Sequence, residues 1–152
     1  MAGLIIGDNN FSTGTLGSGV TFPVGHVIKT TQYTSTSSAG SSSGTYVTIM
    51  TQAYTGTAGN FLMITSETTA SVRAGYYVWL RATYDGAMCG SYAMYENAVN
   101  AHGTALGSAV SMTGVVICGS GAKNILIQSD NTSSSAVTVG GVNRITVIEI
   151  QQ

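Results

Sequence analysis

Side chains that could carry chemistry are scarce in this sequence, and their spacing suggests no reactive site. The chain has two histidines, two cysteines and six acidic residues among 152. His26, His102, Cys89 and Cys118 form no pair of the H-x-x-x-H or C-x-x-C kind that holds a metal ion. We therefore predict no metal site and no cofactor, and we assign structural or surface roles to the histidines.

A pair of carboxylates is the remaining route to catalysis, as in the hydrolysis of sugars. Asp85, Glu96, Asp130 and Glu149 are the residues that could supply it. Asp85 lies in the sequence YDG and Asp130 in SDN, and both contexts are typical of turns. Because charged residues are only 7% of the chain, we predict that it has no catalytic residues and is not an enzyme.

The low content of charged residues also indicates which partners the chain can bind. A typical soluble domain has roughly 25% charged residues, whereas this chain combines 7% with 43% hydrophobic residues and a net charge of -1. Monomeric proteins usually keep many charges on their surface for solubility, so we expect much of this surface to contact other protein. The few basic residues are scattered and no apolar run approaches the roughly 20 residues of a membrane helix, so we predict neither nucleic-acid binding nor membrane insertion.

Two cysteines do not make a disulfide framework in a domain of this size. We expect free thiols at Cys89 and Cys118, as in a protein made in a reducing cytoplasm, with a mutual disulfide as the alternative.

The chain divides into an arm and one domain. Residues 1–22 are rich in glycine and lack periodicity, which predicts an extended arm, and residues 23–152 are long enough for a single core. The arm carries the apolar residues Leu4, Ile5, Ile6 and Phe11. We predict that they attach the domain to a neighbouring protein by adding a strand to its sheet edge, and a disordered or self-packed terminus is the alternative.

From Val24 onward, short β-branched and aromatic segments recur between Gly, Asn, Asp and Ser. This spacing, with a single proline, predicts an all-β antiparallel sandwich with little or no helix. Residues 95–103 are either a short helix or a loop. The expected strands lie at 24–33, 45–55, 61–65, 75–84, 87–95, 105–112, 114–118, 124–128, 136–139 and 144–150.

Two of these strands, 75–84 and 144–150, are apolar on both faces. An antiparallel strand with one wet face should alternate, so we expect a second subunit to cover the outer face. A fully buried central strand within a monomer is the alternative. The predicted interface comprises Trp79, Arg81, Ile145, Val147 and Glu149, with Arg81 and Glu149 as an ion pair across it.

Both ends of the domain resemble a known family. The stretch TFPVGHVIKTTQYTSTSS (21–38) carries the pattern F-P-x-G-x-V-I, and AVTVGGVNRITVIEIQQ (136–152) closes on I-T-V-x-E-I. These segments resemble the ends of C-terminal head domains of phage tail-fibre and head-fibre proteins, although no diagnostic motif lies between them. The resemblance implies a jelly-roll-like sandwich in a homotrimer similar to complement-type and tumour-necrosis-factor-type heads, with the last strand near the threefold axis.

We therefore predict a structural component of a bacteriophage virion, made in the host cytoplasm. It would be a trimeric head-decoration or fibre-like protein, held to major capsid or tail proteins by the arm. Fibres of the resembled family usually have a long stem, but here only the arm precedes Pro23. The alternative is an adhesin that binds a host receptor or surface glycan. Its receptor-facing loops would include Ser35, Ser41, Asp130 and Asn131.

Overall fold

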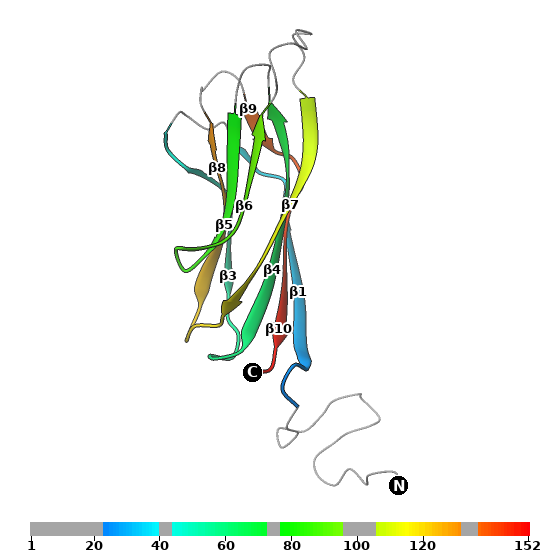
Figure 1. Cartoon of the computed structure of the whole chain (residues 1–152), viewed down its shortest axis with the longest axis vertical. Coiled ribbons are helices and arrows are strands. Elements are labelled where there is room, and N and C mark those ends of the chain that lie inside the picture. Colours follow the sequence, from blue (N-terminus) through cyan, green and yellow to red (C-terminus); the bar gives the residue numbers. More distant parts are fainter. Residues whose placement is uncertain (1–22, 40–43, 73–76, 96–105, 132–136) are drawn as a thin grey trace, which may run out of the picture.

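The computed structural model describes residues 23–39, 44–72, 77–95, 106–131 and 137–152. Two antiparallel sheets pack face to face, and the described residues contain no helix (Figure 1). The first sheet contains β1 (Val27–Ser35), β2 (Ser38–Ala39), β4 (Phe61–Val72), β7 (Leu106–Ile117), β9 (Val137–Gly140) and β10 (Asn143–Ile150). The second contains β3 (Val47–Tyr54), β5 (Tyr77–Tyr84), β6 (Ala87–Tyr95) and β8 (Lys123–Asn131).

The strand pairings describe one long antiparallel ribbon that is rolled up. β1 pairs with β10, β3 with β8, β4 with β7 and β5 with β6, so the first strand meets the last and the ribbon closes at the β5–β6 hairpin. Rolling then brings β10 beside β4 and β8 beside β5. The short β9 pairs with the end of β4 beyond β10, and the short β2 pairs with β9. This arrangement is a jelly roll, which confirms the predicted fold class.

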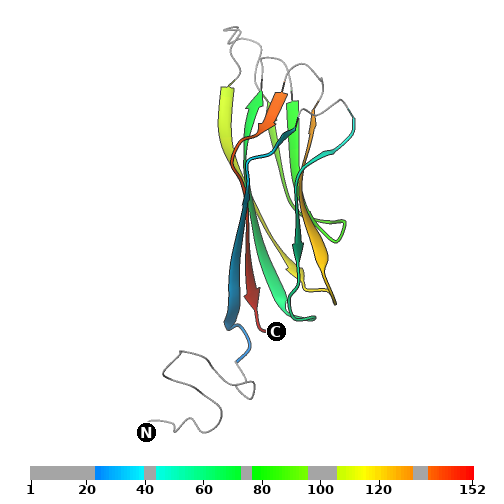
Figure 2. The ribbon, with the colours of Figure 1, turned by 180° about the vertical axis from the view of Figure 1, so that it is seen from behind.

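The core lies between the two sheets, which Figure 2 shows from behind. Burial in β10 alternates strictly from Asn143 onward, because successive side chains of a strand point to opposite faces. The largest fully buried side chains come from both sheets: Tyr54, Leu62, Ile64, Val78, Leu80, Ile125, Ile127, Ile145 and Val147.

One glycine marks a close approach of backbones where the sequence suggested a break between strands. The segments 105–112 and 114–118 form the single strand β7. Gly114 lies within it, opposite Ile64, and a Cβ atom at this position would overlap the backbone oxygen of Cys89 in β6. Glycine is therefore needed because β6 and β7 cross closely at this side of the sandwich.

Of the two aspartates that were expected in turns, only Asp85 lies in one. Asp85 and Gly86 form the two-residue turn between β5 and β6, both with positive φ (50° and 83°), as the type I′ hairpin requires. Asp130 instead lies within β8, so its predicted turn is wrong. The possible helix at 95–103 lies almost entirely outside the described residues.

Candidate functional site

Ile145, Val147 and Glu149 lie inside the sandwich, so placing them at a subunit interface was wrong. Ile145 and Val147 are fully buried, and the side chain of Glu149 is 2% exposed within the single chain. The sequence pattern correctly separated the two faces of β10. It gave no means of telling which of the two apolar faces meets the other sheet.

Glu149 is held by donors of its own chain. Its carboxylate accepts hydrogen bonds from the Tyr54 hydroxyl (2.9 Å), the Thr57 backbone N–H (2.8 Å) and the Asn60 side-chain amide (2.7 Å). Burial by itself would raise the pKa of Glu149, but these donors stabilise the carboxylate and hold the pKa below its ordinary value. Burial and the bond to Glu149 raise the pKa of the Tyr54 hydroxyl. The network ties the β3–β4 connection to the last strand, which is a structural role.

Arg81 does not pair with Glu149, so the predicted ion pair is also wrong. It lies on the outer face of the second sheet, where its Nε–H donates to the Gln128 Oε1 at 2.8 Å. The guanidinium carbon lies 3.8 Å from the centre of the Tyr46 ring. Gln128 in turn donates to the Thr48 hydroxyl at 3.1 Å. The Arg81 side chain is thus fixed by Gln128 of β8 and by Tyr46, the residue before β3.

Trp79 continues this group along β5. Its ring stacks on Tyr77 with centroids 5.4 Å apart and planes 10° from parallel. Both rings remain about two-fifths exposed, at 38% for Trp79 and 40% for Tyr77. We call the group formed by Tyr46, Tyr77, Trp79, Arg81 and Gln128 the aromatic strip.

The outer face of the first sheet has a different character. The paired residues Val27, Ile150, Phe61 and Ile117 form a row across β1, β10, β4 and β7. In the next row, Thr30 pairs with Ile148, Ile148 with Met63 and Met63 with Val115. Val27, Val115 and Ile117 are 50%, 62% and 60% exposed, although they are large and apolar. We call this group the apolar patch: Val27, Phe61, Met63, Val115, Ile117, Ile148 and Ile150.

The patch is confined to one end of its sheet. With strands about 4.8 Å apart and alternate residues roughly 6.7 Å apart, its two rows cover an area of about 19 by 13 Å. The following row pairs Gln32, Thr146, Thr65 and Thr113, which are polar. Further along the face, Arg144 and Glu67 form an ion pair at 2.9 Å. The apolar end is the end at which the C-terminus lies (Figure 1).

The described residues among those predicted for receptor-facing loops come from both sheets. Ser35 ends β1 in the first sheet and hydrogen-bonds to the Ser37 hydroxyl at 2.8 Å. Asp130 and Asn131 end β8 in the second sheet, where the Asp130 carboxylate accepts from the Gly44 backbone N–H at 3.1 Å. Ser41 and the arm residues Leu4, Ile5, Ile6 and Phe11 lie outside the described residues.

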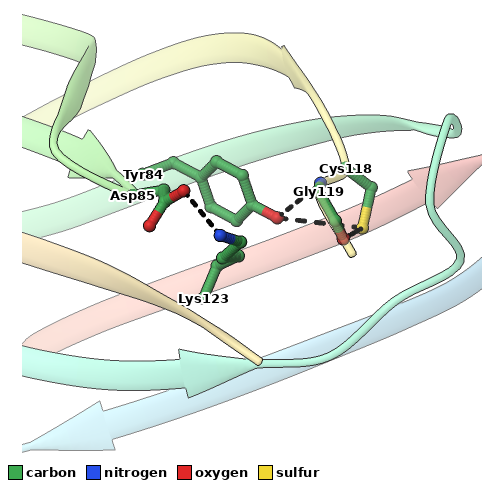
Figure 3. A network of polar contacts seen from close by, with 5 residues as sticks. All are labelled: Tyr84, Asp85, Cys118, Gly119 and Lys123. Atoms are coloured by element: carbon green, nitrogen blue, oxygen red, sulfur yellow. Dashed lines mark hydrogen bonds and ion pairs between the residues drawn. The ribbon is translucent and has the colours of Figure 1, made fainter. Parts of the chain in front are cut away.

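A second polar network surrounds Cys118 at the same end of the core as Glu149, because Gly56 lies close to both side chains (Figure 3). The Tyr84 hydroxyl accepts from the Gly119 N–H at 3.0 Å and donates to the Cys118 sulfur at 3.8 Å. Asp85 binds Lys123 at 2.8 Å beside it. Burial raises the pKa of the Tyr84 hydroxyl, which opposes its use as a proton donor. The contacts fasten the β5–β6 turn to the connection between β7 and β8.

Both cysteines are free and buried, which confirms the predicted thiols. Across the described ranges, no group of three or more His, Cys, Asp and Glu side chains is arranged to hold a metal ion. In the same part of the chain, no helix has the length and apolarity needed to cross a membrane.

No protein-family model matches the chain, and no curated protein matches it significantly.

Proposed function

We propose that this chain is a non-enzymatic structural component of a bacteriophage particle, which assembles as a homotrimer through the apolar patch. The observation that carries the proposal is the patch itself. Val115 and Ile117 are exposed in the single chain and sit beside Phe61, Met63 and Ile148 without a charged residue in the two rows. Exposed contiguous apolar surface of this kind supports a contact with other protein.

A second copy of the chain is the partner that best fits the patch. A stable interface buries roughly 800 Å² per partner, of which the dry centre is a part. The patch supplies about 250 Å² of flat sheet, calculated from strand and residue spacing. The polar rows of the same face and the strand edges would make up the rim. The phage assignment draws on the terminal segments that resemble fibre head domains, and the jelly roll agrees with it.

The arm at residues 1–22 would attach the trimer to major capsid or tail proteins. A head-decoration protein and a fibre-like protein both fit this arrangement. The second candidate is a host adhesin, and the exposed rings of Tyr77 and Trp79 favour it. The two functions are compatible, since a structural trimer can also present a binding surface.

The oligomeric state tests the proposal. Light scattering on a sizing column should give three chains of 15.5 kDa for the wild type. Val115→Lys and Ile117→Lys should each yield folded monomers, because a charge in the dry centre of an interface loses its solvation. Met88→Lys is the matched control, since Met88 is 65% exposed but lies on the second sheet.

A wild-type monomer, or trimers that persist in both patch variants, would refute the assembly. The phage role is tested separately by gold-labelled antibody on particles made from the genome that encodes the chain. Label on intact particles is expected, and its absence would count against a virion component.

A further inference from the structure

We propose that the aromatic strip binds a neutral pyranose sugar of a host-surface glycan. This inference rests on the proposed function, because it assigns the face of the trimer that points away from its axis. The first support is the pair of exposed rings, Tyr77 and Trp79, held parallel on the outer face of β5. Exposed aromatic rings offer an apolar surface against which the C–H groups of a sugar ring can lie.

Fixed polar groups stand next to these rings. Arg81 follows Trp79 on the same face of β5, and its Nε–H is used by Gln128. Within the described residues, the other four N–H groups of the guanidinium have no hydrogen-bond partner. Asp130 lies directly opposite Trp79 on β8 and presents carboxylate oxygens as acceptors. Sugar hydroxyls both donate and accept, so a ligand lying on the rings would meet donors from Arg81 and acceptors from Asp130.

The groups around the rings are already ordered. The Arg81 guanidinium lies on the Tyr46 ring, and Gln128 is bonded to both Arg81 and Thr48. One Asp130 oxygen is bonded to the Gly44 backbone. Binding to groups that are already held in place costs less side-chain entropy than binding to mobile ones.

The charges favour a ligand without net charge. Arg81 and Asp130 are opposite in sign and lie in neighbouring rows of the same face. At the far end of the sheet, Lys123 and Asp85 already pair with each other at 2.8 Å. A phosphate or an acidic sugar would meet Asp130 beside the rings, whereas a neutral pyranose would not be repelled.

Symmetry keeps the strip away from the trimer contact. In a closed ring of three, the two neighbours of a subunit lie about 60° apart as seen from it. The aromatic strip and the apolar patch lie on opposite faces of the sandwich, so a closed trimer cannot use both. If the apolar patches meet at the centre of the trimer, the aromatic strips of the three subunits face outward. Three weak sugar sites on one particle then bind a glycan-coated surface by avidity.

The single tryptophan of the chain provides the assay, since Trp79 is the only one. The wild-type trimer would be titrated with neutral oligosaccharides of glucose, galactose, mannose and N-acetylglucosamine, and with sialyllactose as the acidic probe. We expect a saturable change of tryptophan emission with at least one neutral probe and none with sialyllactose. Arg81→Ala should weaken binding at least tenfold, and Met88→Ala should leave it unchanged.

Trp79→Ala removes the reporter, so its binding is followed by saturation-transfer NMR and should be lost. The inference is overturned if no neutral probe binds, if only the acidic probe binds, or if Trp79→Ala binds as the wild type does. It is also overturned if Trp79→Ala or Arg81→Ala dissociates the trimer, because the strip would then be a subunit contact. A wild-type monomer that still binds sugar through Trp79 would refute the assembly and leave the sugar site standing.

Discussion

Replacing the buried carboxylate of Glu149 by an amide should destabilise the fold in a pH-dependent way. In Glu149→Gln the three donors from Tyr54, Thr57 and Asn60 remain, but they no longer meet a negative charge. A hydrogen bond to a charged group contributes about 1.5–3 kcal/mol against about 1 kcal/mol for a neutral one. The amide can keep most of the geometry, and we expect a loss of about 2 kcal/mol at pH 7.

The sign of the pH dependence follows from the lowered pKa of Glu149. A carboxylate whose pKa is lower in the folded chain stabilises the fold above its unfolded pKa, which is about 4.3 for glutamate. This stabilisation is lost as the pH falls through the folded pKa, where the carboxylate takes up a proton. The wild type and Glu149→Gln should therefore differ at pH 7 and converge toward pH 2.

Urea unfolding at pH 7, 5, 3 and 2, at one protein concentration, measures this difference. Glu67→Gln is the control, because Glu67 pairs with Arg144 at the surface with both side chains 42% exposed. Its removal should cost no more than about 1 kcal/mol. A Glu149→Gln deficit that is the same at pH 7 and pH 2 would show that the charge is not what stabilises the network.

Three further predictions concern the frame. Gly114→Ala should cost at least about 3 kcal/mol, because the new Cβ overlaps the backbone of Cys89 and overpacking of this kind strains the core; a melting temperature equal to the wild type would contradict it. Gly86→Ala should cost about 1 kcal/mol through its positive φ of 83°, measured by the same melt, and an unchanged melting temperature would argue against the turn conformation. Cys89 and Cys118 should react with a thiol reagent only after unfolding, since both are buried, and labelling of the native protein would contradict their burial.

Alternation of residue types predicted the strands because it depends only on neighbouring positions. In β5 it separated the two faces correctly, since Val78 and Leu80 are buried while Trp79 is exposed. It failed in β3, where Ile49 and Met50 are both buried, because a bulge between Thr48 and Met50 shifts the register. A bulge depends on the partner strand, which the local pattern does not contain.

The two surfaces were harder to predict because each depends on pairings between distant segments. Tyr46, Arg81 and Gln128 meet only because β8 lies between β3 and β5. For the aromatic strip, the signal in the sequence was the set of aromatic and charged residues on one face of 75–84. From this face Trp79 and Arg81 were chosen, as interface residues. For the apolar patch the signal was the second face of 144–150, which was recognised and then passed over in favour of Ile145 and Val147.

The outer face of the first sheet changes from apolar to charged along its length, and this gradient constrains the proposed trimer. The Val27–Ile150–Phe61–Ile117 row lies at the C-terminal end, and the Arg144–Glu67 pair lies near the other. Three copies that bring this face to a common axis would exclude water at the apolar end. At the charged end they would bring three cations and three carboxylates together, which favours hydration and a wider spacing. Contact in the proposed trimer should therefore be closest at the end where Gly25 pairs with Gln151, next to Pro23. If residues 1–22 attach the trimer as proposed, force on them would enter the chain at Pro23, close to the tightest part of the subunit interface.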